Sequence, residues 1–487
     1  MSDSTLQSAG DVVTVQAGPA SEPAQSARHA TAQARPKPLY PQLRARRNAS
    51  REAVAAHQRA RLHAAMIEAS ARYGYAETTV AKLVGLAGVS KKALYQRFES
   101  KEECFLATYD LVVRQAVERI SAAYRDAPAD ERDWAAGLCR AFDAFAGELV
   151  ERPKPSQLAL VEVLAAGPAA LERIESAEAV FARMIAQSLA QAPDAVTLPP
   201  LLLRSLVGGV WFVSRSRLLG GQPAAVSGCG HELFEWILAY RAPAAGSLPC
   251  TAVAPAPPRG GAPEWPVDVE GDERTRMLRC AAQVAARGGY LGLTSGQIVE
   301  QAGVSAEAFA ETFDSVGECF LTSLELLSAK ALARALRESE GAPDWPAAVC
   351  RAVRALLCEI AENPVFARVA FVEVFAAGPA GIERRAALMR SFATVLARRA
   401  PRERRPSPLV AEAIVGAVWS IAHRHVARDR AQLLPSLSGH AAYLVLAPIL
   451  GAEEAVDAIL AGLLTDEGGS SDAKTGVYSG TPAKGVA

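Results

Sequence analysis

The stretch TVAKLVGLAGVSKKALYQRFESKEECF, residues Thr79 to Phe105, decides the fold of this chain. Its first third carries apolar residues at helical spacing, namely Val80, Leu83, Val84 and Ala87. That spacing places them on one buried face of a helix. Gly88 supplies the backbone freedom for a sharp turn, and Ser90 is placed to cap a second helix. Ser100 and Glu103 form an S-x-x-E capping box, which predicts that a third helix begins at once.

The second helix of this stretch has two different faces. Leu94 and Phe98 lie four residues apart and are expected to turn inward. The opposite stripe is basic, polar and aromatic, and consists of Lys91, Lys92, Tyr95 and Gln96. A short helix with such a stripe, braced by another helix across a glycine turn, has the shape and chemistry to read the major groove of DNA.

These residues resemble the TetR family of bacterial transcriptional regulators. The amino-terminal pattern of that family is Thr, AGVS, LY-x-[HR]-F and SKE-x-x-F, and it is matched at Thr79, Ala87 to Ser90, Leu94-Tyr95, Arg97-Phe98, Ser100 to Glu102 and Phe105. The resemblance implies an all-α fold in which a three-helix helix-turn-helix head precedes a helical domain for ligand binding and dimerisation. It also implies a DNA-binding repressor that a small molecule releases, although activation is not excluded.

Nine side chains are the candidate DNA contacts. Base or near-base contacts are expected from Ser90, Lys91, Lys92 and Gln96, and phosphate contacts from Thr78, Thr79, Tyr95, Arg97 and Lys101. Hydroxyl groups and free N–H groups at a helix start can meet a phosphate. A helix-turn-helix pattern alone fits a purely structural three-helix unit as well, but the joint match at fixed spacing favours a DNA reader.

Composition limits the other possibilities. With 487 residues, half of them hydrophobic, the chain has material for about three domains with sizeable cores. Its 52 basic and 52 acidic residues give zero net charge, so a DNA-binding surface must be local. Eight cysteines occur without a C-x-x-C pair, which favours reduced thiols over a zinc site or a disulfide framework.

Several classes of function find no support in the sequence. No secretory signal and no run of 18 apolar residues is found, so we expect a cytoplasmic protein without a membrane partner. We find no nucleophile with a base and an orienting group, no phosphate loop and no metal-ligand cluster. The sequence therefore predicts a protein that is not an enzyme and that carries no cofactor and no metal.

The second half of the chain repeats the first. Shifted by 215 residues, Gly74 to Leu106 aligns with Gly289 to Leu321, and 15 of those 33 positions are identical. Later motifs repeat as well, since VEVLAAGPA from Val161 returns as VEVFAAGPA from Val372. The sequence thus predicts two tandem TetR-like units of the same kind rather than a short-period repeat.

The two heads differ in charge. Lys91, Lys92, Tyr95, Gln96 and Arg97 correspond to Ala306, Glu307, Ala310, Glu311 and Thr312, respectively, with Val316 in the place of Lys101. Residues 50–101 carry nine basic and four acidic groups, a balance of +5, whereas residues 265–316 carry four and eight, a balance of −4. Carboxylates would repel the phosphate backbone. The second helix-turn-helix is therefore expected to be degenerate, with DNA read by the first head alone.

These observations predict seven segments. They are a disordered basic arm (1–49), the DNA-binding head (50–106), a helical domain (107–241), a Pro/Ala/Gly linker (242–271), the degenerate head (272–321), a second helical domain (322–463) and a disordered tail (464–487). The first helix is expected over Ser50 to Tyr73, and partner-packing helices over Leu201 to Leu219 and Glu232 to Tyr240. The basic arm either enters the minor groove or only aids solubility.

The expected partners are double-stranded operator DNA and a small-molecule effector of unknown identity. The two units could pair within one chain as a pseudo-dimer, between chains as a homodimer, or both. The alternative function is a helical ligand- or partner-binding adaptor that does not bind DNA. The intact basic stripe argues against that alternative.

Overall fold

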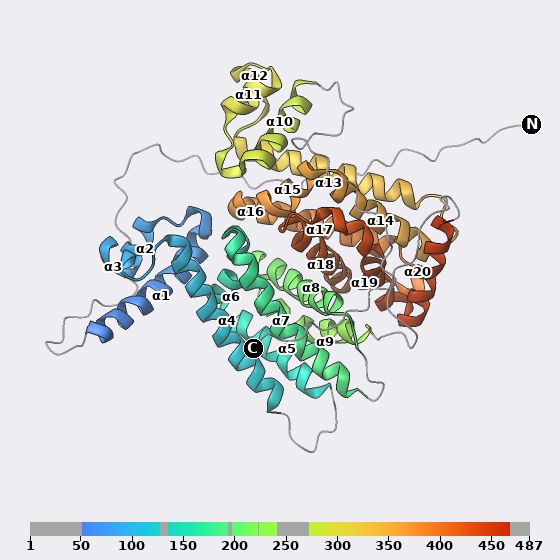
Figure 1. The fold of residues 1–487 in the computed structure, drawn as a ribbon, viewed down its shortest axis with the longest axis horizontal. Coiled ribbons are helices and arrows are strands. Elements are labelled where there is room, and N and C mark those ends of the chain that lie inside the picture. The colour runs from blue at the N-terminus through green and yellow to red at the C-terminus, as the bar shows by residue number, and fades with distance from the viewer. Residues whose placement is uncertain (1–50, 127–134, 193–196, 223, 241–271, 468–487) are drawn as a thin grey trace, which may run out of the picture. The chain divides into compact units, whose positions relative to one another are not determined.

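The computed structural model describes residues 51–126, 135–192, 197–222, 224–240 and 272–467. Within these ranges all regular secondary structure is helical, which confirms the all-α prediction (Figure 1). The predicted arm, the predicted linker and residues 468–487 of the predicted tail lie outside the described residues. We refer to residues 51–240 as the first half and to residues 272–467 as the second half.

The first head consists of α1 (Arg51–Glu77), α2 (Val80–Ala87), α3 (Lys91–Tyr95) and the start of α4 (Lys101–Arg125). Its core contains Leu62, Met66, Leu83, Leu94 and Phe105, each with no exposed surface. The first run of helix ends at Tyr73, as predicted, because Gly74 has non-helical backbone with φ 76°. A short further helical stretch follows to Glu77, and glycine adopts positive φ without steric cost.

The remainder of the first half is a set of helices, and prolines open several of them. They are α5 (Ala136–Glu151), α6 (Pro153–Leu160), the 3₁₀ helix η1 (Glu162–Ala165), α7 (Pro168–Gln191), α8 (Pro200–Leu219) and α9 (Ala224–Leu238). The start predicted for the last helix, Glu232, was wrong by eight residues, since α9 begins at Ala224. The buried Trp236 and Ile237 anchor this helix, and such packing outweighs the cost of glycines within it, about 1 kcal/mol each.

The second half begins with helices in the same order as the first head. They are α10 (Glu273–Gly288), η2 (Tyr290–Gly292), α11 (Ser295–Ala302), α12 (Ala306–Thr312) and α13 (Val316–Ser339). The caps match as well. Ser305 caps α12 and Ser315 caps α13, as Ser90 and Ser100 cap α3 and α4. The turn before α12 uses Gly303 with φ 63°, and the turn before α3 uses Gly88 with φ 60°.

The remaining elements complete the second half. They are α14 (Trp345–Glu362), α15 (Pro364–Arg368), η3 (Val369–Glu373), α16 (Val374–Ala376), α17 (Gly378–Arg399), η4 (Arg402–Arg404), α18 (Pro408–Val426), η5 (Ala431–Leu437), α19 (Ser438–Leu450) and α20 (Ala452–Glu467). Helix α20 extends past residue 464, where the tail was expected to start. The segment Ala431–Leu450 is long and apolar enough to span a membrane, but 72% of it is buried within the protein, as in a core helix.

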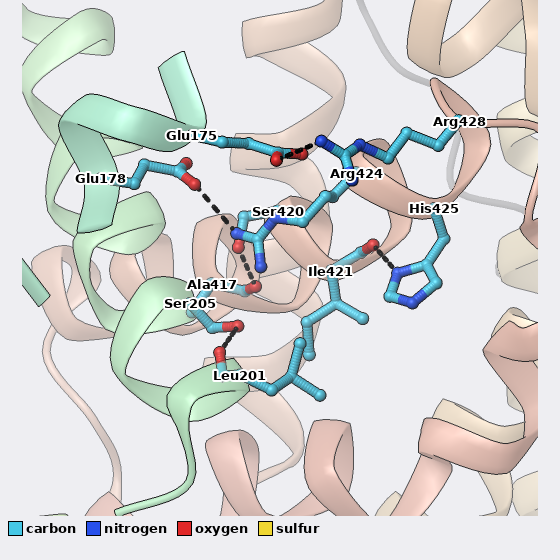
Figure 2. A network of polar contacts seen from close by, with 10 residues as sticks. All are labelled: Glu175, Glu178, Leu201, Ser205, Ala417, Ser420, Ile421, Arg424, His425 and Arg428. Atoms are coloured by element: carbon cyan, nitrogen blue, oxygen red, sulfur yellow. Dashed lines mark hydrogen bonds and ion pairs between the residues drawn. The ribbon is translucent and has the colours of Figure 1, made fainter. Parts of the chain in front are cut away.

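Helix α8 of the first half packs against α18 of the second half. Glycines allow the close approach: a β-carbon on Gly416 would lie 2.5 Å from Cβ of Phe212, and one on Gly208 would lie 2.5 Å from Cβ of Ser420. Ion pairs flank this packing, as Figure 2 shows for Glu178 and Glu175 of α7. They contact Arg424 at 3.1 Å and Arg428 at 2.5 Å, respectively. The two halves of one chain are thus joined through a helix pair.

Candidate nucleic-acid interface

Helix α3 presents a basic and polar face to solvent. Its cap, Ser90, is exposed, and the Ser90 hydroxyl accepts a hydrogen bond from the backbone N–H of Ala93 at 3.0 Å. Leu94 is fully buried and Phe98 is 4% exposed, which fixes the inward face. The side chains left exposed are Lys91, Lys92, Tyr95 and Gln96. The outward stripe expected from the sequence is therefore accessible to solvent.

The turn between α2 and α3 is braced by a residue that sequence reasoning missed. Gly88 adopts the left-handed conformation and donates its N–H to the carbonyl oxygens of Gly85 and Val84. The guanidinium of Arg61, on α1, donates to the carbonyl oxygen of Gly88 at 2.9 Å. The sequence signal was weak, because one arginine on a basic helix gives no hint that it points inward. These bonds hold α3 at a fixed angle to α1 and α2.

The two threonines at the start of α2 have different surroundings. Thr79 is exposed, and its hydroxyl accepts a hydrogen bond from the N–H of Lys82 at 3.3 Å. Thr78 is 1% exposed, and its hydroxyl donates to the carbonyl oxygen of Gly74 at 2.7 Å. The structure thus gives Thr78 an internal bracing role. We correct the expectation that Thr78 contacts phosphate, because a buried hydroxyl cannot reach a ligand outside the head.

Arg97 and Lys101 are partly engaged within the protein. Arg97 donates from Nη2 to Oε1 of Gln58 at 3.3 Å. Lys101 donates from Nζ to the carbonyl oxygen of Tyr75 at 3.0 Å and lies 4.2 Å from the centre of the Tyr75 ring. Burial lowers the pKa of Lys101 from its usual value. An ammonium group has three donors, so Lys101 keeps hydrogen-bonding capacity for a phosphate.

Lys82, on α2, is a further basic group at this surface that the sequence reading did not select. Its Nζ donates to the carbonyl oxygen of Glu77 at 2.8 Å and lies 4.5 Å from the centre of the Tyr73 ring. It follows the exposed cap Thr79 by three residues, one helical turn. The start of α2 therefore offers a cation beside free N–H groups, the chemistry of a phosphate site.

The equivalent surface of the second half is acidic. On α12 the exposed side chains are Ala306, Glu307, Ala310 and Glu311, while Phe309 is 6% exposed and faces the core. Hydrogen bonds at the start of α12 lower the pKa of Glu307, which keeps this carboxylate ionised. The inward positions of α3 and α12 are thus alike, and their outward positions carry opposite charge.

A buried carboxylate ties each head to the helices behind it. The N–H of Tyr75 donates to Oε2 of Glu162 at 2.7 Å, and Glu162 is 4% exposed. In the second half the N–H of Tyr290 donates to Oε2 of Glu373 at 2.9 Å. Neither carboxylate was predicted as functional. Both lie in the repeated motif VEV[LF]AAGPA, which was the only signal available from the sequence.

Comparisons with known proteins agree with this geometry. Residues 62–108 match the family model described as "Bacterial regulatory proteins, tetR family". They span the second part of α1, both helices of the helix-turn-helix and the first turns of α4. No curated protein matches the chain.

Solved structures of regulators are similar to part of the chain. The regulator FadR from Bacillus subtilis in complex with stearoyl-CoA is 16% identical, with 37% of this chain and 96% of that chain covered at a TM-score of 0.33. A TetR-like regulator from Rhodococcus sp. RHA1 is 22% identical, with 38% and 97% covered at a TM-score of 0.32. Residues 62–108, which contain the helix-turn-helix observed here, are thus similar to the DNA-binding region of the tetR family of bacterial regulatory proteins.

Proposed function

We propose that the chain is a cytoplasmic transcriptional repressor that reads operator DNA with its first head alone and that a small-molecule effector releases from DNA. The observation that carries the proposal is the outward face of α3. Lys91, Lys92 and Gln96 are exposed on a short helix that Leu94 and Phe98 fix from behind. Donors on a helix of this kind can reach base edges in the major groove.

The proposed contacts divide into two groups. Ser90, Lys91, Lys92 and Gln96 contact bases or their immediate surroundings. Thr79, Tyr95, Arg97 and Lys101 contact phosphates, and Lys82 joins them from the start of α2. Phosphate contacts fix the register of the protein on DNA, while base contacts determine which sequence is bound.

The chain arose, in this proposal, by tandem duplication of one tetR-type unit. Two features support it: the 15 identities in 33 aligned positions, and the recurrence of the same caps and turn glycines. The second head retains its fold and has lost DNA binding, since Glu307 and Glu311 stand where the first head has Lys92 and Gln96. Carboxylates at these positions remove the counterion-release term that drives non-specific binding.

The packing of α8 on α18 supports pairing of the two units within one chain. One chain then offers one DNA-reading head, whereas a palindromic operator needs two heads about 34 to 36 Å apart, or a multiple of that. We therefore expect either two chains on a palindrome or one chain on an asymmetric half-site. Light scattering of the protein–DNA complex gives the number of chains per site.

Selection of bound sequences from random DNA tests the proposed function directly. The full-length protein should enrich one sequence motif, and the double variant Lys91→Ala/Lys92→Ala should lose that enrichment. Arg402→Ala/Arg405→Ala is the matched control, because both arginines are exposed and lie in the second half. This control should select the wild-type motif. Absence of any enriched motif, or unchanged selection by the Lys91/Lys92 variant, would favour the adaptor function instead.

A further inference from the structure

A cavity of about 350 Å³ lies within the helices of the second half. Its walls come from α13, α14, α17 and α18 and are apolar, with Leu336, Leu356, Phe392, Leu396 and Trp419 among the lining side chains. Several of these, Leu336 and Phe392 included, are only partly buried although they lie between helices. The volume falls within the range of small-molecule sites in proteins, about 300 to 1,000 Å³.

One buried cation lines this apolar cavity. Arg385, on α17, is 2% exposed, and its Nε, Nη1 and Nη2 have no hydrogen-bond partner among the described residues. The guanidinium lies 3.7 Å from the centre of the Trp419 ring and 5.3 Å from that of Phe375. These rings stabilise the flat face of the guanidinium. Its N–H donors project from the edge in the guanidinium plane, so ring contacts leave them unsatisfied.

Among the described residues, Arg385 has no ion pair with a carboxylate. The charged group that acts on it is Arg215 of α8, a second buried cation, and burial together with Arg215 lowers the pKa of Arg385. Glu178 is engaged by Arg424 at 3.1 Å. His423 stacks on the Trp419 ring 4.5 Å away, and burial lowers its pKa to about 3, so it is neutral at pH 7. A buried positive charge without a counter-ion is costly, and an anion in the cavity would relieve that cost.

The corresponding position in the first half carries no charge. In the register that aligns VEVLAAGPA with VEVFAAGPA, the residue equivalent to Arg385 is Ile174. Two cavities among the described helices of the first half measure about 40 and 50 Å³, far less than the cavity beside Arg385. The combination of a buried arginine and this cavity thus lies in the second half, which also carries the acidic head.

We propose that this cavity binds a medium- or long-chain carboxylic acid, with the carboxylate held by Arg385 and the alkyl chain along the apolar walls. Arginine and carboxylate pair through two parallel hydrogen bonds, which is the geometry that the free edge of Arg385 offers. The alkyl chain extends along α17 toward the exposed Arg399, which also lines the cavity. Arg385 and Arg399 are 14 positions apart, about 21 Å along a helix.

The same arginine contacts the other half of the chain. Its guanidinium lies 5.6 Å from the centre of the ring of Phe212, on α8, and Phe212 is the side chain against which Gly416 of α18 packs. A carboxylate that draws Arg385 toward the cavity therefore changes a contact in the α8–α18 pair. This step rests on the proposed function, because it makes the cavity the effector site of the repressor.

Isothermal titration of the full-length protein with dodecanoate and with methyl dodecanoate tests the proposal. Dodecanoate should bind at least tenfold more tightly than its methyl ester, which has the same chain and no charge. Arg385→Met should weaken dodecanoate binding at least tenfold. The matched control is Arg384→Met, because Arg384 is half-exposed and pairs with Glu325 at 2.6 Å, and it should bind as the wild type does.

Two results would overturn the proposal: equal affinity for acid and ester, or no binding of octanoate, dodecanoate or hexadecanoate. Circular dichroism reports whether Arg385→Met folds. If this variant does not fold, the comparison of acid with ester on the wild-type protein is sufficient to test the proposal. The Lys91→Ala/Lys92→Ala variant separates this proposal from the proposed function. It should bind dodecanoate with wild-type affinity whether or not it binds DNA.

Discussion

The backbone N–H of Tyr75, at the kink of α1, donates to the carboxylate of Glu162 at 2.7 Å across 87 residues of sequence. Glu162 lies in η1, among the helices behind the DNA-binding head. Gly74 has φ 76°, and a β-carbon there would lie 3.5 Å from the same carboxylate oxygen. The bond therefore joins the head to the body of the first half at a point where the backbone itself is bent.

Glu162→Ala should destabilise the protein and weaken DNA binding. It leaves the buried Tyr75 N–H without an acceptor, which costs about 1 to 3 kcal/mol of unfolding free energy. It also frees the head to pivot, so DNA affinity should fall several-fold. Urea denaturation and fluorescence anisotropy with operator DNA measure the two effects.

Glu373→Ala is the matched control for that change. It removes the equivalent bond to Tyr290 in the second half. It should also lower stability, but DNA affinity should remain at the wild-type level because, in the proposed function, only the first head reads DNA. Equal losses of DNA affinity in both variants would contradict the assignment of DNA binding to the first head.

Glu162→Gln should reveal the pH dependence of this bond. Burial raises the pKa of Glu162 above its usual value, so the folded state favours the protonated carboxyl. As pH rises, the carboxyl of Glu162 ionises first in the unfolded chain, where its pKa is about 4.5. The unfolding free energy of the wild type therefore falls between that pKa and the higher pKa of the folded state. Glutamine keeps an oxygen acceptor without the charge. The stability of the variant relative to the wild type should therefore rise across that interval in denaturation series run at several pH values.

Much of the first head could be predicted from the sequence because its signals are local. The caps Ser90 and Ser100, the turn at Gly88 and the inward Leu94 each follow from spacing within a few residues. Thr78 was misjudged because its spacing does not show that its hydroxyl turns inward, where it donates to the carbonyl oxygen of Gly74 four residues earlier. Arg61 and Arg385 are ordinary helical residues by sequence. Their roles arise from tertiary contacts that bring distant helices together.

Lys101→Met should weaken binding to all DNA sequences alike. A phosphate contact releases counterions, so its loss should lower the slope of log K against log salt concentration by about 0.9. Lys154→Met is the matched control, because Lys154 is exposed outside the head and pairs with Glu68 at 2.5 Å. Its salt slope should equal that of the wild type. Anisotropy titrations at four salt concentrations measure this slope for both variants. An unchanged slope for Lys101→Met would show that Lys101 does not contact DNA phosphates.

Gly416→Ala should disrupt the packing of α8 on α18. The new methyl group would meet the Phe212 side chain at 2.5 Å, and overpacking of this kind costs about 1 to 3 kcal/mol. Gly147→Ala is the control within a helix, because a β-carbon at Gly147 has no neighbour within 4 Å. This control should be neutral or stabilising by up to about 1 kcal/mol. Thermal unfolding compares the two variants. Equal melting temperatures would show that the α8–α18 pair accommodates the added methyl group without loss of stability.

In the proposed function the second head does not bind DNA, and the acidic face of α12 should be the reason. Its fold is intact: Ser305 caps α12, and Phe309 and Phe313 are 6% and 4% exposed. The differences from the first head fall instead on exposed positions, where drift and selection can change charge without loss of stability. If the units bind DNA as proposed, an acidic second head should also disfavour binding in the reverse orientation, since its carboxylates would face phosphates.

Restoring the basic stripe tests this explanation. The variant Ala306→Lys/Glu307→Lys/Ala310→Tyr/Val316→Lys should fold as the wild type does, because Ala306, Glu307 and Ala310 are exposed and Val316 is only partly buried. It should gain affinity for random-sequence DNA, and that gain should disappear at high salt. A control with Ser and Gln in place of Lys at the same positions should gain much less. If the restored variant unfolds, the acidic face packs against another surface; if it folds but gains no affinity, charge is not what keeps the second head from DNA.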